Sequence, residues 1–285
     1  MLCDLHTHSH YSDGSSSPAE IIDLALAANL KAIALTDHNT TLGLKEFSDY
    51  AADKPIEAVT GIEISTDYKG RELHILALFI DPDRYPEIEA KLAPFKSGKS
   101  ESNRCLAKAL NKAGYEISYD NLLSATPDGN VNRAHFAAEL VKRGYFATIQ
   151  QCFEAVLDEA KGYYVPAAKL SAFDAIKFIH SLNAVAVLAH PFYSLKTEER
   201  LRGFLDDCKG LPLDGMETYY SLHDEATESL ACKIADEYCL ICSGGSDFHG
   251  NRKPDIQIGK GKGGLQIPDE CYYSLKAKSL QKAAC

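Results

Sequence analysis

The chain has 285 residues and a formal net charge of −10, with 25% charged and 45% hydrophobic residues. This is the composition of an ordinary globular protein, and the negative charge argues against a general nucleic-acid binder, which is usually basic. The sequence shows neither a signal segment nor an apolar run near the roughly 20 residues that a membrane span needs, so we expect a cytoplasmic α/β protein.

Short apolar runs recur along the chain and are predicted to be strands. They are rich in Ile, Leu, Val and Ala, as is typical of parallel strands buried on both faces. The runs are residues 2–6, 32–37, 58–64, 73–80, 184–190, 214–219 and 240–247. Helical spacing of apolar residues predicts helices at 19–28, 172–181, 198–208 and 225–238. This alternation favours a parallel barrel or a doubly wound sheet.

The positions of acidic and imidazole side chains favour the barrel. Every run except 214–219 ends in, or is edged by, a His, Asp or Glu. Barrels place their active sites at the C-terminal ends of the strands, whereas a doubly wound sheet concentrates its chemistry at one switch point. Residues 100–113, 134–144 and 149–160 look helical and break the alternation. We therefore expect a barrel domain, residues 1–96 and 161–285, with a helical insertion, residues 97–160, over the active site.

The first strand carries a candidate metal-binding pair, His6 and His8. Side chains two apart on a strand point to the same face, so both imidazoles can reach one ion. Asp13 follows in a turn-rich loop that can fold back towards them. A His-x-His pair alone is equally consistent with two structural histidines.

The next three strands add further candidates. The second ends in a polar cluster, where His38 is a candidate ligand and Asp37 a candidate for orienting a ligand histidine. Glu63 lies among apolar residues, and an unpaired buried carboxylate is costly, so we expect a cation beside it. His74 stands at the start of its run and by itself would more often be structural.

The last candidates follow the later strands: His190 before a proline, and Asp247 with His249 in a glycine-rich segment. The full set is six histidines and three carboxylates, more than one ion needs. It suits two or three divalent ions with open positions for substrate and water. Because no thiolate is among them, a structural zinc site is disfavoured, and Mn²⁺, Fe²⁺ and Zn²⁺ are the candidates.

Taken together, these motifs resemble the polymerase and histidinol phosphatase (PHP) family. The resemblance is carried by segments 4–8, 11–14, 36–40, 61–65, 189–191 and 246–249, together with His74. It implies a distorted (β/α)₇ barrel with two or three metal ions. It also implies a first ion bound by His6, His8, Glu63 and Asp247, a second by Asp13, His38 and His249, and a third by His74 and His190 with Glu63 bridging. An Asp at position 13 resembles the branch of small stand-alone phosphoesterases that carry a helical insertion.

Within that branch the chain resembles phosphatases of 3',5'-nucleoside bisphosphates, although residues 132–135 read Asn-Arg-Ala-His where many relatives have Arg-Pro-His. The resemblance implies metal-dependent hydrolysis of a phosphate monoester by metal-bound hydroxide. The substrate would be a small phosphorylated metabolite or a nucleotide such as a 3',5'-nucleoside bisphosphate. We expect the protein to bind neither a membrane nor a stable protein partner. The alternatives are a 5'-3' exoribonuclease on short RNA, a histidinol-phosphate phosphatase and an inactive metal-binding module.

Cations in the insertion are candidates for binding substrate. Arg104 and Arg133 can each grip a phosphate through two parallel hydrogen bonds, and Lys161 adds a third positive charge. Each could equally be a solvated surface residue. For protonation of the leaving oxygen, the candidates are Asp247 and His223.

Overall fold

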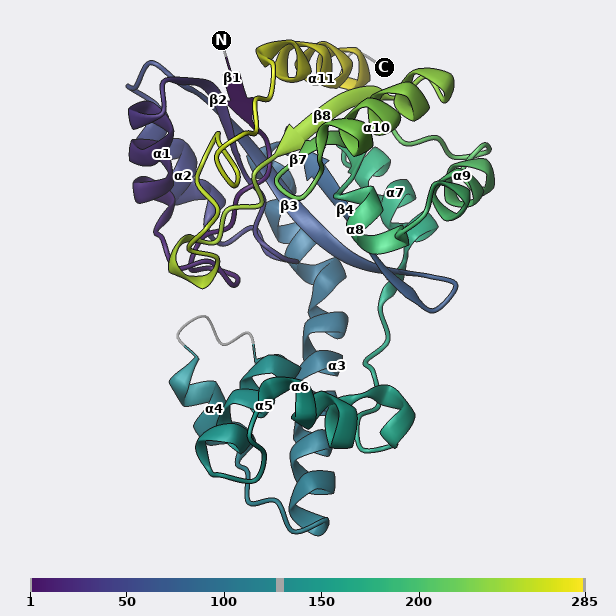
Figure 1. Cartoon of the computed structure of the whole chain (residues 1–285). Helices are drawn as coiled ribbons and strands as arrows, with labels where there is room; N and C mark the ends of the chain where they lie inside the picture. The colour runs from purple at the N-terminus through teal and green to yellow at the C-terminus, as the bar shows by residue number, and fades with distance from the viewer. Residues whose placement is uncertain (1, 127–130, 284–285) are drawn as a thin grey trace. The chain divides into compact units, whose positions relative to one another are not determined.

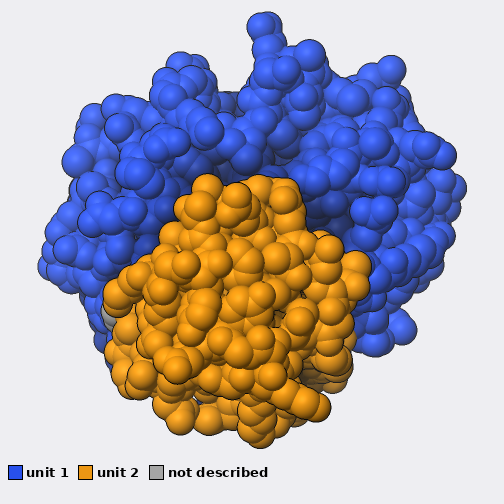
Figure 2. Space-filling model, turned by 60° about the horizontal axis from the view of Figure 1, so that its bottom comes forward, with its two compact units in different colours: residues 1–89, 170–285 blue, residues 90–169 orange. Residues whose placement is uncertain are grey.

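The computed structural model describes residues 2–126 and 131–283 (Figure 1). The chain forms two compact units, one of Met1–Glu89 and Leu170–Cys285 and the other of Ala90–Lys169 (Figure 2). The second unit thus begins earlier and ends later than the 97–160 insertion expected from the sequence. Among the described residues, no helix is long and apolar enough to cross a bilayer.

The first unit is built on a nearly closed barrel of seven strands, which confirms the expected fold class. In sheet order the strands are β1 (Leu2–Asp4), β2 (Leu30–Leu35), β3 (Glu57–Tyr68), β4 (Arg71–Leu78), β6 (Val185–Leu188), β7 (Gly215–Tyr220) and β8 (Ile241–Gly245), while the short β5 (Leu170–Ser171) pairs with β3 outside this path. The segment after β1 bonds β8 and the segment after it through the backbone, Leu5 N to Gly244 O at 3.0 Å and His8 N to Phe248 O at 2.9 Å. The Asp4 side chain adds a further hydrogen bond between these segments, since its Oδ1 accepts from Ser246 N at 2.9 Å.

β4 departs from the expected parallel arrangement, so that prediction was wrong for this strand. It pairs antiparallel with both β3 and β6. The cause is the connection to β3, a tight turn at Lys69 and Gly70, both with positive φ. A turn this short can only join antiparallel strands, because a parallel crossover needs a dozen or more residues. The start of β4, rather than its end, therefore lies beside the end of β3, and His74 pairs with Ser65.

Helices surround this barrel, and the four predicted from apolar spacing are confirmed to within two residues. They are α1 (Pro18–Ala27), α7 (Ala172–Ser181), α9 (Glu198–Asp207) and α10 (Glu225–Glu237). The start of α1 is fixed by a capping box, in which Ser17 accepts from Glu20 N and Glu20 accepts from Ser17 N. Three further helices were not predicted: α2 (Leu44–Ala51), α8 (Pro191–Leu195) and α11 (Asp269–Ala283).

α11 covers the end of the barrel at which the parallel strands begin (Figure 1). Its Tyr272 and Leu275 join the barrel's buried apolar cluster. The Tyr272 hydroxyl also donates to Glu57, the first residue of β3, at 2.7 Å. Since this end is closed by packing, the opposite end, where the parallel strands finish, is left for chemistry.

The second unit is helical and has its own apolar core. It contains α3 (Tyr85–Lys112) from residue 90 onward, α4 (Tyr119–Ala125), α5 (Arg133–Lys142) and α6 (Ile149–Cys152). The helix expected at 149–160 does not run through: after α6 the chain makes a π-helical turn at Phe153–Leu157 and a 3₁₀ turn at Glu159–Lys161. Asp158 explains the break, because its extended backbone ends one turn while its side chain caps the next.

Phe136 tests the independence of this core. The side chain is completely buried among the apolar residues of Ala90–Lys169, so Phe136→Ala should cost about 3–5 kcal/mol through lost burial and a residual cavity. Hydrogen exchange of the α5 amides and chemical unfolding would measure the loss. The control is Ile149→Ala, whose side chain is 48% exposed and whose loss should cost below about 0.5 kcal/mol. Equal effects of the two substitutions would contradict the packing described.

Candidate metal centre

The end of the barrel opposite α11 gathers all nine candidate ligands. Each lies on a strand or in the segment that directly follows one, or in the loop before α1 in the case of Asp13. Their donor atoms form four groups, with the atoms of each group within 4.8 Å of one another: His8, Asp13, His38 and His249; His6, Glu63 and His190; His6, His8 and Asp247; His38, Glu63 and His74. The grouping differs in detail from the expected ion sets, since His8 also joins the Asp13 group and His74 and His190 fall in separate groups.

The Glu63 carboxylate lies at the centre of this cluster. Its Oε1 is 2.7 Å from His74 Nδ1 and 2.9 Å from His190 Nε2. Its Oε2 is 3.1 Å from His38 Nδ1 and 3.2 Å from the Nε2 atoms of both His6 and His8. The five rings come from four strands or the segments directly after them. A single side chain on β3 therefore contacts most of the cluster.

Several potential ligand atoms in the cluster are buried without an aligned hydrogen bond. They include Glu63 Oε2, His8 Nδ1 and His38 Nδ1, although Glu63 Oε2 and His38 Nδ1 lie 3.1 Å apart. Burial without a partner is costly, and native proteins normally satisfy such atoms. Burial also lowers the pKa of His38 to about 3, so its imidazole is neutral and offers a lone pair. Oxygen and neutral nitrogen atoms that converge in this way fit divalent cations.

The three carboxylates of the cluster are ionised. Burial alone would raise the pKa of Glu63, but His74 and His6 hold it well below its usual range. Burial would also raise the pKa of Asp13, but the contact with His249 Nε2 at 3.2 Å helps to lower it. The pKa of Asp247 is likewise held well below normal against burial by its contact with His8. Three negative charges close together supply the attraction that a cluster of divalent ions requires.

The two carboxylate oxygens of Asp247 have different partners, one inside the cluster and one outside it. Oδ1 is 3.3 Å from His8 Nε2 and 3.4 Å from His249 Nδ1. Oδ2 accepts from the Tyr220 hydroxyl at 3.0 Å and from Lys253 Nζ at 2.7 Å. With both oxygens engaged and the group ionised, Asp247 is poorly suited to protonate a leaving oxygen.

The other two candidates for catalytic roles, Asp37 and His223, also have defined partners. Asp37 Oδ1 accepts from Ser9 N at 2.8 Å and its Oδ2 from Ser9 Oγ at 2.6 Å, so it fixes the loop that leads to Asp13. His223 Nδ1 donates to Thr218 O at 2.8 Å, and burial lowers the pKa of His223. A neutral ring with its one proton already donated is disfavoured as a leaving-group acid.

The candidate cations of the insertion all lie in the second unit. Arg104 pairs with Asp120 at 3.0 Å and stacks over the Tyr119 ring. Arg133 donates to Leu157 O at 3.2 Å, and its guanidinium lies 4.5 Å from the Tyr164 ring centroid. Lys161 is exposed in the 3₁₀ turn.

Sequence reasoning missed three residues that contact the candidate ligands: Tyr220, Lys253 and Glu217. Glu217 is completely buried, and its Oε1 lies 2.9 Å from His6 Nδ1. A signal for it existed, since Glu217 is an acid inside an apolar run just as Glu63 is. Lys253 directly follows a single 3₁₀ turn at Gly250–Arg252, and no periodic pattern in the sequence predicts the direction of its side chain.

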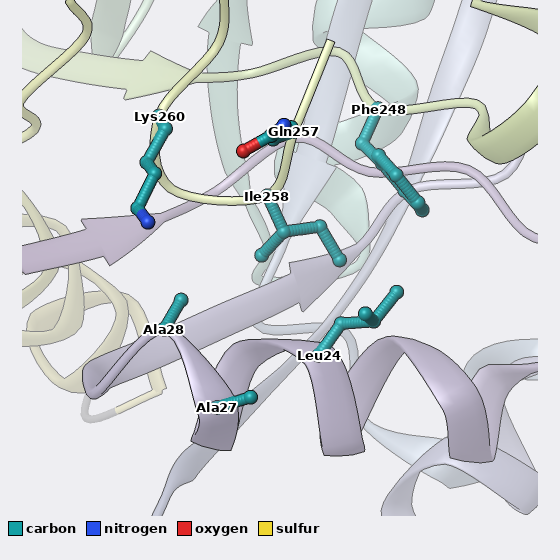
Figure 3. A pocket seen from close by; sticks show the side chains of 7 residues that line it. All are labelled: Leu24, Ala27, Ala28, Phe248, Gln257, Ile258 and Lys260. Atoms are coloured by element: carbon teal, nitrogen blue, oxygen red, sulfur yellow. The ribbon is translucent and has the colours of Figure 1, made fainter. Parts of the chain in front are cut away.

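A separate cavity of about 240 Å³ lies between the end of α1 and the segment that follows β8 (Figure 3). It is lined mainly by apolar side chains, including Leu24, Phe248 and Ile258. None of the nine candidate ligands lines it, although Phe248 stands between two of them in the sequence. The cavity therefore lacks the groups that phosphate chemistry requires.

Comparison with known proteins places this geometry in context. Residues 4–181 match the family described as PHP domain. A 5'-3' exoribonuclease from Haemophilus influenzae is 35% identical over 246 residues, which are 86% of this chain and 89% of that protein. A 3',5'-nucleoside bisphosphate phosphatase from Chromobacterium violaceum is 30% identical over 281 residues, 98% of both chains. A solved structure from C. violaceum, described as an amidohydrolase with bound sulfate and no metal, has a TM-score of 0.81 and 30% identity, and the match covers 98% of this chain and 97% of that one.

Replacement of Glu63 tests the centre of the cluster. Glu63→Gln removes the negative charge and turns an amide donor towards imidazole nitrogens, so we expect at least ~100-fold weaker Mn²⁺ binding, because even outer-shell changes cost 10–100-fold. Metal content after equilibrium dialysis would measure it. Glu57→Gln is the matched control on the same strand, since Glu57 bonds Tyr272 and Lys276 at the other end of the barrel. Unchanged metal content in Glu63→Gln would exclude Glu63 as a ligand.

Proposed function

This chain belongs to the PHP domain family and is a metal-dependent phosphoesterase, and we propose that it hydrolyses a phosphate monoester of a nucleotide, such as a 3',5'-nucleoside bisphosphate. The observation that carries the proposal is the buried Glu63 carboxylate with five imidazoles within 3.2 Å of it. The substrate class is supported by the C. violaceum bisphosphate phosphatase, which matches over 98% of both chains.

We propose that the cluster holds two or three divalent ions. The ligand sets would be His6, His8, Glu63 and Asp247; Asp13, His38 and His249; and His74 with His190, bridged by Glu63. Ions of this kind supply Lewis-acid activation of water and neutralise phosphoryl charge. The groups around the ligands keep them in place: Tyr220 and Lys253 hold Asp247 Oδ2.

For the rest of the substrate we propose cation contacts from the insertion. Arg133 is the strongest candidate because its planar guanidinium can grip a phosphate through two hydrogen bonds. The Tyr164 ring and the Leu157 carbonyl limit its freedom, which reduces the entropy lost on binding. Arg104 and Lys161 are more exposed and are secondary candidates.

A second candidate function is 5'-3' exoribonuclease activity on short RNA. It is favoured by the H. influenzae exoribonuclease, which shares 35% identity over 86% of this chain. The two activities differ in the bond that is broken, since an exoribonuclease cleaves a phosphodiester and the bisphosphatase cleaves a monoester. A diester substrate therefore separates them.

The substrate proposal predicts release of inorganic phosphate from adenosine 3',5'-bisphosphate. Metal-stripped protein should be inactive, added Mn²⁺ should restore turnover, and His6→Ala should abolish it because a ligand is lost. Phosphate release measured with and without Mn²⁺ would test this. Cleavage of a short 5'-phosphorylated RNA or of histidinol phosphate, with the bisphosphate untouched, would retain the metal chemistry and overturn the proposed substrate.

The role of Arg133 predicts a substrate-dependent effect. Arg133→Ala should raise KM about 10–100-fold for a bisphosphate, the equivalent of losing a charged hydrogen bond of about 1.5–3 kcal/mol. KM for p-nitrophenyl phosphate, which has no second phosphate, should change little. Arg143→Ala serves as the control, because Arg143 lies at the end of the same helix and pairs with Glu139. Equal losses on both substrates would exclude a role in gripping the second phosphate.

A further inference from the structure

We infer that Glu217 is a positioning residue whose single carboxylate orients two ligands of the metal centre, His6 and His190. The inference rests on the proposed metal-dependent function, and it concerns the binding of the metal rather than the reaction. Glu217 lies in the middle of β7, the one strand among the seven of the barrel from which no ligand was predicted. It is completely buried, so its two oxygens must find partners inside the protein.

Both oxygens of Glu217 are used as acceptors. Oε1 lies 2.9 Å from His6 Nδ1, and Oε2 accepts from the backbone N–H of His190 at 2.6 Å. The two partners follow different strands, His6 after β1 and His190 after β6. One carboxylate therefore links two parts of the cluster that are distant in the sequence.

The contact with His6 selects one tautomer of its ring. Because a carboxylate only accepts, the contact with Glu217 keeps a proton on Nδ1, and Nε2 is the ring nitrogen that would offer its lone pair to a bound divalent ion. Nε2 faces the cluster, at 3.0 Å from His8 Nε2 and 3.2 Å from Glu63 Oε2. A carboxylate behind a ligand histidine is a common device for fixing its orientation and raising its basicity.

The contact with His190 supports an unusual backbone. His190 has φ 28° and ψ 61°, in the left-handed region that non-glycine residues rarely adopt. This conformation directs the ring so that its Nε2 lies 2.9 Å from Glu63 Oε1. The bond from His190 N–H to Glu217 helps to hold the backbone there.

A matched control is Asp214, the residue directly before β7. Its buried Oδ2 also accepts from a backbone N–H, that of Ala186 at 2.9 Å, and it also lies near an imidazole, His180 Nε2 at 3.2 Å. Lys282 pairs with it at 3.0 Å. Asp214 thus makes the same kinds of contact at the end of the barrel remote from the cluster.

The test is Glu217→Gln, which keeps the shape of the side chain but replaces one acceptor with an amide donor. If the amide oxygen stays on His190 N–H, the NH₂ group faces His6 Nδ1 and moves the ring proton to Nε2. In the other orientation two donors meet at His190. Either outcome disables one ligand, so Mn²⁺ affinity from calorimetric titration should fall 10–100-fold. Asp214→Asn should lower Tm through its lost ion pair and leave Mn²⁺ affinity within about twofold of wild type.

A second variant keeps the inference testable if Glu217→Gln does not fold. Glu217→Asp retains two acceptors on a shorter side chain, and we expect intermediate Mn²⁺ affinity. In nitrogen-15 spectra of the histidine rings recorded with bound Zn²⁺, His6 should carry its proton on Nδ1 in the wild type and lose that signal in Glu217→Gln. Wild-type Mn²⁺ affinity in both Glu217 variants, or a drop in Tm without a drop in affinity, would overturn the inference. A wild-type chain that bound no divalent ion would overturn the proposed function instead.

Discussion

The buried Glu63 carboxylate is the constraint on which this structure depends. An ionised group in the interior of a barrel is stable only when cations or donors surround it on every side. Five histidines surround it, from strands that are far apart in the chain, and Glu63 Oε2 still lacks an aligned hydrogen bond that a divalent ion would replace. The reversed β4 serves the same end, because a parallel β4 would carry His74 away from Glu63. The fold and the chemistry are therefore set by the same few side chains.

Much of this arrangement could be predicted from the sequence, for a local reason. Histidines and acids at the ends of apolar runs are visible in the chain, and a barrel brings strand ends together whatever lies between them. The antiparallel direction of β4 was harder to predict from the sequence. Two features indicated it: His74 stands at the start of its run, and Lys69–Gly70 leaves room only for a tight turn. Glu217 was visible as an acid inside an apolar run, but its partners, like the contact of Lys253 with Asp247, are tertiary contacts that no periodic pattern encodes. The length of the helix expected at residues 149–160 was overestimated, because Asp158 caps a separate 3₁₀ turn and its extended backbone ends the turn before it.

Both ends of the barrel carry carboxylates with defined partners, but these carboxylates have different roles at the two ends. At one end Asp214 and Glu57 pair with residues of α11, so their charges help to fix the packing of that helix. At the other end Glu217 and Asp37 have no Lys or Arg partner among their described contacts and instead hold histidines, backbone and loop in place. The stabilising carboxylates and the functional ones are thus separated along the strands, and substitutions at one end should be largely independent of those at the other.

The closure of the barrel also bears on how the protein is made. The segment after β1 is joined to β8 by the backbone bond from Leu5 N to Gly244 O, and Ser246 N bonds Asp4, 242 residues away in the sequence. On a ribosome, the first histidines emerge long before Asp247 and His249 can join them. Contacts of such long range form late, because the entropy of closing the intervening loop must be overcome first. A nascent chain would therefore hold an incomplete set of ligands through most of its synthesis, and full loading with metal would belong to the finished chain.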